Sequence, residues 1–212
     1  MTKVRFSLPL LLGSLLMLVL ACNGGGETPT PGLTPSGSPA LNPTPKTYTQ
    51  RPSLSIDPNK KYIATVKTVK GDFKIELRPD IARETVNSFI FLARDGYFDG
   101  VTFHRVIPGF VAQTGDPTGT GSGGPGYTLP AEFSQIPYQR GTVGMARTMD
   151  PNSGGSQWFV TYADAPNLND QYTVFGKVIE GMEVVDAITP RDPADPTAPP
   201  GDAILTIEIS EQ

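Results

Sequence analysis

The chain has 212 residues and a formal net charge of −4 at pH 7, with 17 basic and 21 acidic side chains. It offers no basic patch for nucleic acid or for an anionic membrane surface, so no nucleic-acid partner is expected. One histidine and one cysteine argue against a zinc site or a histidine-based hydrolase, and we expect no metal or cofactor.

Residues 1–21 have the features of a signal peptide. Lys3 and Arg5 form a basic start, and the Leu-rich run 8–20 is too short to span a bilayer comfortably but fits a signal-peptide core. The run ends at Cys22 in a stretch that resembles a bacterial lipoprotein cleavage box. The alternative is an ordinary secretory signal in which Cys22 is incidental.

Cys22 is the only cysteine, so no intrachain disulfide can form. Two acyl chains on this residue would suffice for stable anchoring. We therefore expect an exported protein that is lipid-anchored through Cys22 to the outer face of the cell membrane or to the outer membrane. Residues 22–58 are rich in Pro, Gly and Thr and poor in charge, which predicts a disordered tether.

Residues 59–212 have the size of one domain, and most of them predict strands. Strong β-formers over 62–69 are followed by a turn at 70–72 and by alternation over 73–77, which predicts a hairpin with one buried face. Clean alternation over 205–209 predicts another strand near the C-terminus.

Two helices interrupt the strands. The first is predicted over 82–95, with Gly96 as its stop. Its apolar stripe at helical spacing consists of Val86, Phe89, Ile90 and Ala93. The second is short, over 182–188, and Pro190 ends it. Composition and periodicity together indicate a mainly β domain with two helices.

The stretch 103–116 is the most informative part of the chain. It alternates apolar and polar side chains like a half-buried strand and is interrupted by a Pro-Gly pair. One face would carry the guanidinium of Arg105 and the amide of Gln113 beside the ring of Phe110.

This stretch resembles the signature of cyclophilin-type peptidyl-prolyl isomerases. Together with the segments below, its sequence is most similar to the bacterial branch of that family. The resemblance covers nearly the whole domain, and its further matching segments are 119–124, 144–147, 153–159, Leu168 and 172–178. It implies a mainly β fold: a closed, antiparallel, eight-stranded β-barrel capped by two α-helices. It also implies an isomerase that acts on proline-containing polypeptides.

Rotation about an Xaa–Pro bond passes through a twisted amide against a barrier of ~20 kcal/mol. Lowering this barrier requires an apolar pocket for the proline ring and a donor that favours the twisted amide. The resemblance assigns the donor role to Arg105, whose charge is fixed, while Gln113 orients it and contacts the substrate backbone. The alternatives are a surface arginine in a salt bridge and a strand-edge amide bonded to water.

The resemblance also implies a set of substrate-binding residues: Phe110, Val111, Gly119, Ala146, Arg147, Gln157, Phe159, Leu168 and Tyr172. The apolar members of this set would hold the proline ring, with Tyr172 at the edge of the pocket. Ala146 and Arg147 would offer backbone groups to the residues before the proline, and Gln157 a side-chain amide. Gly119 would let its loop pass close to the peptide. Each apolar member could instead belong to the core.

His104 and Trp158 are expected to be structural residues. Each neighbours a candidate site residue in a strand, so its side chain should point to the opposite side. We expect His104 to be buried and hydrogen-bonded, and Trp158 to lie in the core.

Two further expectations concern function and partners. A non-catalytic proline-binding or chaperone module of the same fold is the alternative function, because it would keep the pocket and lack turnover. In drug-sensitive eukaryotic relatives a tryptophan stands at the position of Asn167 and a histidine at that of Tyr172, so weak cyclosporin binding is expected. Nothing in the sequence indicates an oligomer, and a monomer is expected.

Overall fold

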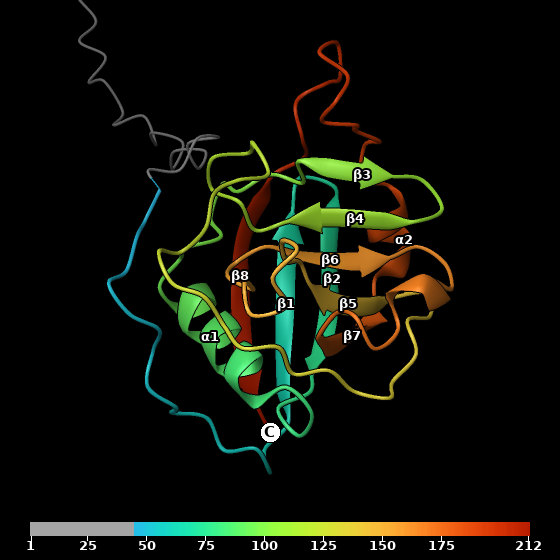
Figure 1. Ribbon diagram of the computed structural model, residues 1–212. Coiled ribbons are helices and arrows are strands. Elements are labelled where there is room, and N and C mark those ends of the chain that lie inside the picture. Colours follow the sequence, from blue (N-terminus) through green and yellow to red (C-terminus); the bar gives the residue numbers. More distant parts are fainter. Residues whose placement is uncertain (1–44) are drawn as a thin grey trace, which may run out of the picture. The chain divides into compact units, whose positions relative to one another are not determined.

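The computed structural model describes residues 45–212, which form one curled antiparallel sheet of eight strands with two α-helices (Figure 1). Across the sheet the strands follow the order β3-β4-β6-β5-β7-β2-β1-β8. Their bounds are β1 Tyr62–Thr68, β2 Gly71–Leu77, β3 Arg105–Ile107, β4 Val111–Thr114, β5 Thr142–Met145, β6 Trp158–Thr161, β7 Val174–Glu180 and β8 Ile204–Glu211. The mainly β fold predicted from the sequence is confirmed.

The sheet is open, which corrects the expected closed barrel. Its edge strands β3 and β8 do not pair with each other in the described part of the chain, and an isolated bridge between Thr102 and Ala203 links the segments just before them. β3 has three residues and ends at the turn of Pro108 and Gly109, so it offers few backbone groups for a ladder with β8. The architecture is therefore a half-barrel.

Irregularities in strand pairing accompany the curl of the sheet. The register shifts within the β1–β8, β2–β7 and β5–β7 pairs, and an extra residue in one strand bends it and increases its twist. As a result β1, β2 and β8 cross the remaining strands steeply (Figure 1).

The local elements follow the sequence pattern closely. β1 and β2 form the predicted hairpin, in which Thr68 pairs with Gly71 across a two-residue loop. The helices α1 (Arg83–Arg94) and α2 (Met182–Asp186) agree with the two predicted helices to within two residues at each end. A 3₁₀ turn, η1 (Pro166–Leu168), lies between β6 and β7.

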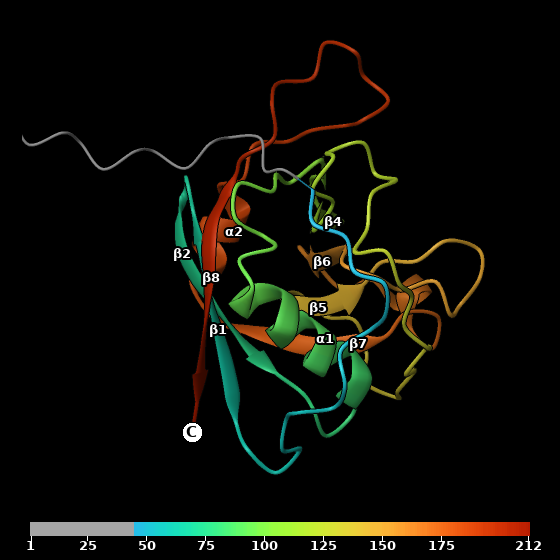
Figure 2. The same ribbon diagram turned by 90° about the vertical axis from the view of Figure 1, so that its left-hand side faces the viewer.

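Helix α1 lies on the side of the sheet that Figure 2 turns toward the viewer. Aromatic side chains join this helix to the sheet. The ring of Phe89 in α1 lies 5.8 Å from that of Trp158 and 5.3 Å from that of Phe175, centroid to centroid. Trp158 has no exposed surface, which confirms its predicted place in the core. A second, smaller apolar cluster around Phe159 is separate from this core.

Residues 45–58, which the sequence assigns to the tether, pack against the domain. Ile56 is buried within the main core. The side chain of Asn87 in α1 accepts a hydrogen bond from the backbone N–H of Ser55 at 2.9 Å and donates one to the carbonyl of Ser53 at 3.1 Å. This stretch therefore makes specific contacts with α1 before β1 begins.

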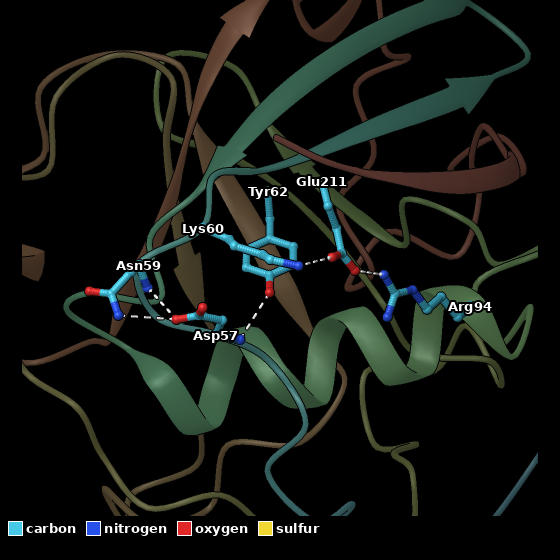
Figure 3. A network of polar contacts seen from close by, with 6 residues as sticks. All are labelled: Asp57, Asn59, Lys60, Tyr62, Arg94 and Glu211. Atoms are coloured by element: carbon cyan, nitrogen blue, oxygen red, sulfur yellow. Dashed lines mark hydrogen bonds and ion pairs between the residues drawn. The ribbon is translucent and has the colours of Figure 1, made fainter.

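Figure 3 shows how the segment enters β1. The backbone N–H of Asp57 donates to the hydroxyl of Tyr62 at 3.0 Å. Nearby, the carboxylate of Glu211 at the end of β8 pairs with Lys60 at 3.3 Å and with Arg94 at the end of α1. These contacts join the start of β1, the end of β8 and the end of α1.

The predicted signal peptide, Cys22 and the tether up to residue 44 lie outside the described residues. Within the described part, no helix combines the length and the apolar character needed to cross a membrane.

Candidate active site

The β3–β4 hairpin places the two predicted catalytic side chains opposite each other. Arg105 pairs with Gln113 in the strand register, and the chain turns at Gly109, whose φ of +73° favours glycine. The Arg105 guanidinium donates to the Gln113 side-chain oxygen at 3.4 Å and lies 5.6 Å from the ring centroid of Phe110. The hairpin thus brings a cation, an amide and an aromatic ring to one face.

In the part of the chain that the structure describes, no carboxylate pairs with the charge of Arg105. Its side chain is half-buried, and it forms no ion pair with any residue in the range 45–212. The surface salt bridge that sequence reasoning left open as an alternative is therefore not observed there.

A line of amides leads away from Arg105. The Gln113 side chain donates to the side-chain oxygen of Gln157 at 3.0 Å. Gln157 in turn donates to the backbone carbonyls of Gly121 at 3.0 Å and Gly123 at 2.9 Å. These hydrogen bonds orient the two glutamines. Their orientation therefore depends on the glycine-rich loop, residues 119–124, which contains Gly121 and Gly123.

The predicted pocket residues gather in one apolar cluster, separate from the main core. Phe159 lies at its centre, with its ring stacked on Tyr138 at 5.7 Å and edge-on to Tyr172 at 5.8 Å. The cluster also includes Phe110, Val111, Ala146, Leu168 and Val174. Phe110, Ala146 and Tyr172 are partly exposed, whereas Val111, Phe159 and Leu168 are buried. The cluster can present an apolar surface beside Arg105.

A groove of about 610 Å³ adjoins this cluster. We call it the groove; its lining includes Gln113, the loop 121–128, Ala146, Arg147 and the stretch 155–157. Gly119 does not line it; this residue lies in the preceding turn with a φ of +67°, near the Thr102 hydroxyl. A smaller cavity of about 280 Å³ lies on the other face of the hairpin, beside Val106 and Tyr162, and contains none of the predicted site residues.

His104 lies on the opposite side of β3 and is buried, as predicted. Neither ring nitrogen has a well-formed hydrogen bond among the described residues, and only a weak contact with the backbone of Thr102 is present. Burial lowers the pKa of His104 and outweighs the nearby charge of Asp116, which raises it. The imidazole is thus kept neutral and away from the groove. In the described range, no cluster of three or more His, Cys, Asp or Glu side chains could hold a metal ion.

Comparison with known proteins agrees with this geometry. The family model of the cyclophilin-type peptidyl-prolyl cis-trans isomerases matches residues 63–209. A probable peptidyl-prolyl cis-trans isomerase of Brucella suis is 49% identical over 146 residues, which cover 63% of this chain and 74% of the relative. A peptidyl-prolyl cis-trans isomerase of Helicobacter pylori is 44% identical over 133 residues, covering 61% and 81%.

The chain belongs to the cyclophilin family. A crystal structure of a cyclophilin from Cryptosporidium parvum superposes with a TM-score of 0.66 at 35% identity, covering 71% of this chain and 98% of that one. A second structure, of the same protein in the presence of the dipeptide Ala-Pro, gives a TM-score of 0.64 at 35% identity, covering 70% and 98%. The family assignment makes this cyclophilin a peptidyl-prolyl cis-trans isomerase.

Tyr138 belongs to the apolar cluster around Phe159 and was missed by sequence reasoning. Its side chain is buried against Phe159. Gly144 allows this packing, because a Cβ at this position would lie 2.4 Å from the Tyr138 hydroxyl and 2.5 Å from the Phe159 ring. Tyr138 lies in a loop whose sequence has no periodic pattern of apolar residues. No local signal therefore indicated that it packs against Phe159.

The side chain of Arg147 also lies at this cluster, where the sequence predicted a role only for its backbone. Its guanidinium lies 4.7 Å from the ring centroid of Tyr172 and donates to the carbonyls of Gln171 and Thr148, each at 2.8 Å. The cation therefore covers the outer face of the tyrosine at the edge of the pocket.

Asp116 organises the glycine-rich loop of the cyclophilin and was also missed as a structural residue. Its carboxylate accepts hydrogen bonds from the backbone N–H of Thr118 at 2.7 Å and of Gly121 at 2.6 Å. Burial raises the pKa of Asp116, but hydrogen bonds outweigh burial and hold the pKa below its usual value. The Thr118 hydroxyl contributes most, followed by the backbone N–H groups of Gly123, Thr118 and Gly121. A buried carboxylate thus supports the loop that orients Gln157.

Proposed function

We propose that this cyclophilin accelerates Xaa–Pro rotation in exported proteins and that Arg105 stabilises the twisted amide above an apolar proline pocket. One observation carries the proposal: the half-buried guanidinium lies beside Phe110 without an ion-pair partner in the described chain. Its charge is available to a substrate, and partial burial strengthens its interaction with a polar group.

The proposed mechanism requires no covalent step. The proline ring rests on Phe110 and Phe159, so its side of the amide is held while the other side rotates. In the twisted state the amide nitrogen becomes pyramidal and can accept a hydrogen bond from Arg105. Gln113 holds the guanidinium in place. Because this hydrogen bond forms only in the twisted state, it lowers the barrier and does not merely tighten substrate binding.

The residues before the proline would lie in the groove. There the backbone of Ala146 and Arg147 offers hydrogen-bonding groups. The side-chain oxygen of Gln157 can accept one more hydrogen bond, whereas its N–H groups are taken by Gly121 and Gly123. The substrate is thus a polypeptide, held by its backbone on one side of the proline and by the apolar cluster at the ring.

The proposed place of action rests on the N-terminal sequence. A signal peptide over 1–21 and acylation of Cys22 would attach the isomerase to a membrane outside the cytoplasm. Labelling of growing cells with a clickable fatty acid tests this: the label should appear on the protein and disappear in Cys22→Ser. A soluble, unlabelled secreted product would contradict the anchor.

A non-catalytic proline-binding module of the same fold is the alternative. Exchange NMR on a blocked Ala-Pro peptide separates the two, using purified residues 23–212. The isomerase account predicts exchange cross-peaks between the cis and trans forms at catalytic amounts of protein. A binding module would shift the peptide resonances without exchange, and that result would overturn the proposal.

A further inference from the structure

The segment before β1 starts at the wall of the groove and then follows the outside of α1 toward β1. We call residues 46–56 the strap; it is part of the blue trace beside α1 in Figure 1. One end of the strap is fixed by Ile56 in the core and by the bonds of Asn87 to Ser53 and Ser55. The other end is fixed by Lys46 and Tyr48.

Tyr48 is held through its ring and its hydroxyl. The ring packs edge-on against Phe91 of α1 at 5.2 Å and lies 6.2 Å from each of Tyr97 and Tyr127. Its hydroxyl donates to the carboxylate of Asp95 at 2.7 Å, which also pairs with Lys46 at 3.1 Å. A tether used only as a spacer would not need this set of contacts.

The backbone of Tyr48 contacts the groove wall directly. Its N–H donates to the carbonyl of Pro125 at 2.8 Å. A Cβ on Gly126, whose φ is +91°, would lie 2.6 Å from the Tyr48 carbonyl oxygen, so only glycine allows this close approach. Pro125, Gly126 and Tyr127 all line the groove.

Two hydroxyl contacts extend the support across the wall. Tyr97, which packs on Tyr48, shares a hydrogen bond with Ser156 at 3.0 Å, and Tyr127 shares one with Ser88 of α1 at 2.8 Å. Ser156 lines the groove and directly precedes Gln157. The aromatic group around Tyr48 therefore joins the strap, α1 and the groove.

We propose that the strap belongs to the catalytic unit and that Tyr48 is a positioning residue, which holds the wall 125–127 in the shape that receives substrate residues before the proline. This rests on the proposed use of the groove by polypeptide substrates. Without the strap the wall 125–127 loses its outer support. Gly121, whose carbonyl orients Gln157, stays bound to Asp116, and Arg105 and Phe110 keep their contacts. The strap should therefore govern how tightly long substrates bind and leave the rotation step unaffected.

The test compares two blocked substrates, Ala-Pro alone and Ala-Pro preceded by three further residues, with Tyr48→Ala in residues 23–212. The expected result is a rise in KM of about fivefold or more for the long peptide, with kcat and the short-peptide KM within about twofold of wild type. Tyr48→Phe keeps the ring and loses the hydrogen bond to Asp95. Its KM for the long peptide should lie between that of the wild type and that of Tyr48→Ala.

Leu54→Ala is the matched control, because this strap residue is exposed and does not line the groove. It should leave KM for both peptides at the wild-type value. An unchanged KM for the long peptide in Tyr48→Ala, or an equal rise for both lengths, would overturn the proposal. Failure of the wild type to turn over the short peptide would instead contradict the proposed function.

Hydrogen exchange gives a second readout if Tyr48→Ala is poorly stable. The amides of Gly126, Tyr127 and Thr128 should exchange faster in this variant at 10 °C, while those of β4 and β6 stay protected. Uniform loss of protection across the domain would show that Tyr48 supports the fold as a whole, and this would also overturn the positioning role.

Discussion

Arg105 and His104 are neighbours in the chain and lie in opposite surroundings. Arg105 faces the groove side of the hairpin with its charge unpaired in the described chain, whereas His104 is buried among core residues. The alternation of side chains along a strand produces this division. It makes the arginine available to substrate and the only histidine of the chain structural.

His104→Gln should therefore change stability more than activity. Burial lowers the pKa of His104, so below the ordinary histidine pKa of about 6.5 the unfolded chain takes up a proton that the folded chain excludes. Wild-type stability should thus fall as the pH drops from 7 to 5, and His104→Gln should flatten this slope. Chemical denaturation of both proteins at several pH values measures how the free energy of unfolding depends on pH.

The same variant carries a second expectation. At pH 7.5 its free energy of unfolding should be lower by about 1–3 kcal/mol, because an amide fits the buried site less well. The kcat/KM per folded molecule should stay within about threefold of wild type. Normal stability combined with loss of turnover would mean that His104 takes part in catalysis.

Asn167 is the residue at which we expect cyclosporin recognition to differ. It is exposed in η1, next to Leu168, which is buried in the apolar cluster around Phe159. An asparagine offers much less contact area than the tryptophan of drug-sensitive relatives, and the loss of ~1.5–3 kcal/mol corresponds to roughly ten- to a hundredfold weaker binding.

Asn167→Trp should thus tighten cyclosporin binding by about tenfold or more and change kcat/KM little. Competition of the drug with a proline peptide measures both quantities in one titration. Tight inhibition of the natural protein, or no gain from the substitution, would show that this position does not control the drug.

Residues whose role depends on contacts that only the folded structure brings together were missed from the sequence. The hairpin 105–114 could be predicted because the alternation and the Pro-Gly pair are local signals. Tyr138 and Asp116 were missed, since the role of the first depends on stacking with Phe159 and that of the second on loop amides whose arrangement no periodicity reveals.

At the scale of elements, α1 begins without a capping side chain of its own. Ala82 stands at the N-cap, and the carboxylate of Glu132 accepts hydrogen bonds from the backbone N–H of Glu84 and of Thr85, each at 2.9 Å. A negative charge at this end also favours the helix dipole. Glu132, a loop residue distant in sequence, thus caps the N-terminus of α1.

Glu132→Ala should lower the free energy of unfolding by about 1–2 kcal/mol, because two partly buried N–H donors lose their acceptor. Glu132→Gln, which keeps one acceptor oxygen, should have a smaller effect. Glu183→Ala is the control, since this exposed carboxylate lies in the first turn of α2 without a capping bond in the described chain. Equal effects of Glu132→Ala and Glu183→Ala in urea unfolding would contradict the cap.

The arrangement of elements was predicted less well than the elements themselves. Strand and helix positions follow local periodicity, but closure of the sheet depends on how β3 and β8 meet, which no single segment reveals. In the same way, the composition of residues 45–58 indicates a spacer, whereas Tyr48 and Ile56 contact partners tens of residues away. Low charge and many prolines do not exclude specific docking.

At the scale of the whole molecule, the curled sheet provides two separate apolar clusters. One joins α1 to the sheet and supports the fold, and the other, around Phe159, opens toward the groove beside Arg105. This separation lets the site be changed without removing the main core. Substitution at Arg105 should for that reason test catalysis without loss of the fold.

The most direct test of the account is the kcat/KM of Arg105→Ala in a protease-coupled assay with an Xaa-Pro peptide, together with its melting temperature. We predict a loss of roughly a hundredfold or more at an unchanged melting temperature, and only slight recovery in Arg105→Lys, which lacks the rigid fork of donors. Near-wild-type turnover by a normally folded Arg105→Ala would contradict the central claim that this guanidinium stabilises the twisted amide.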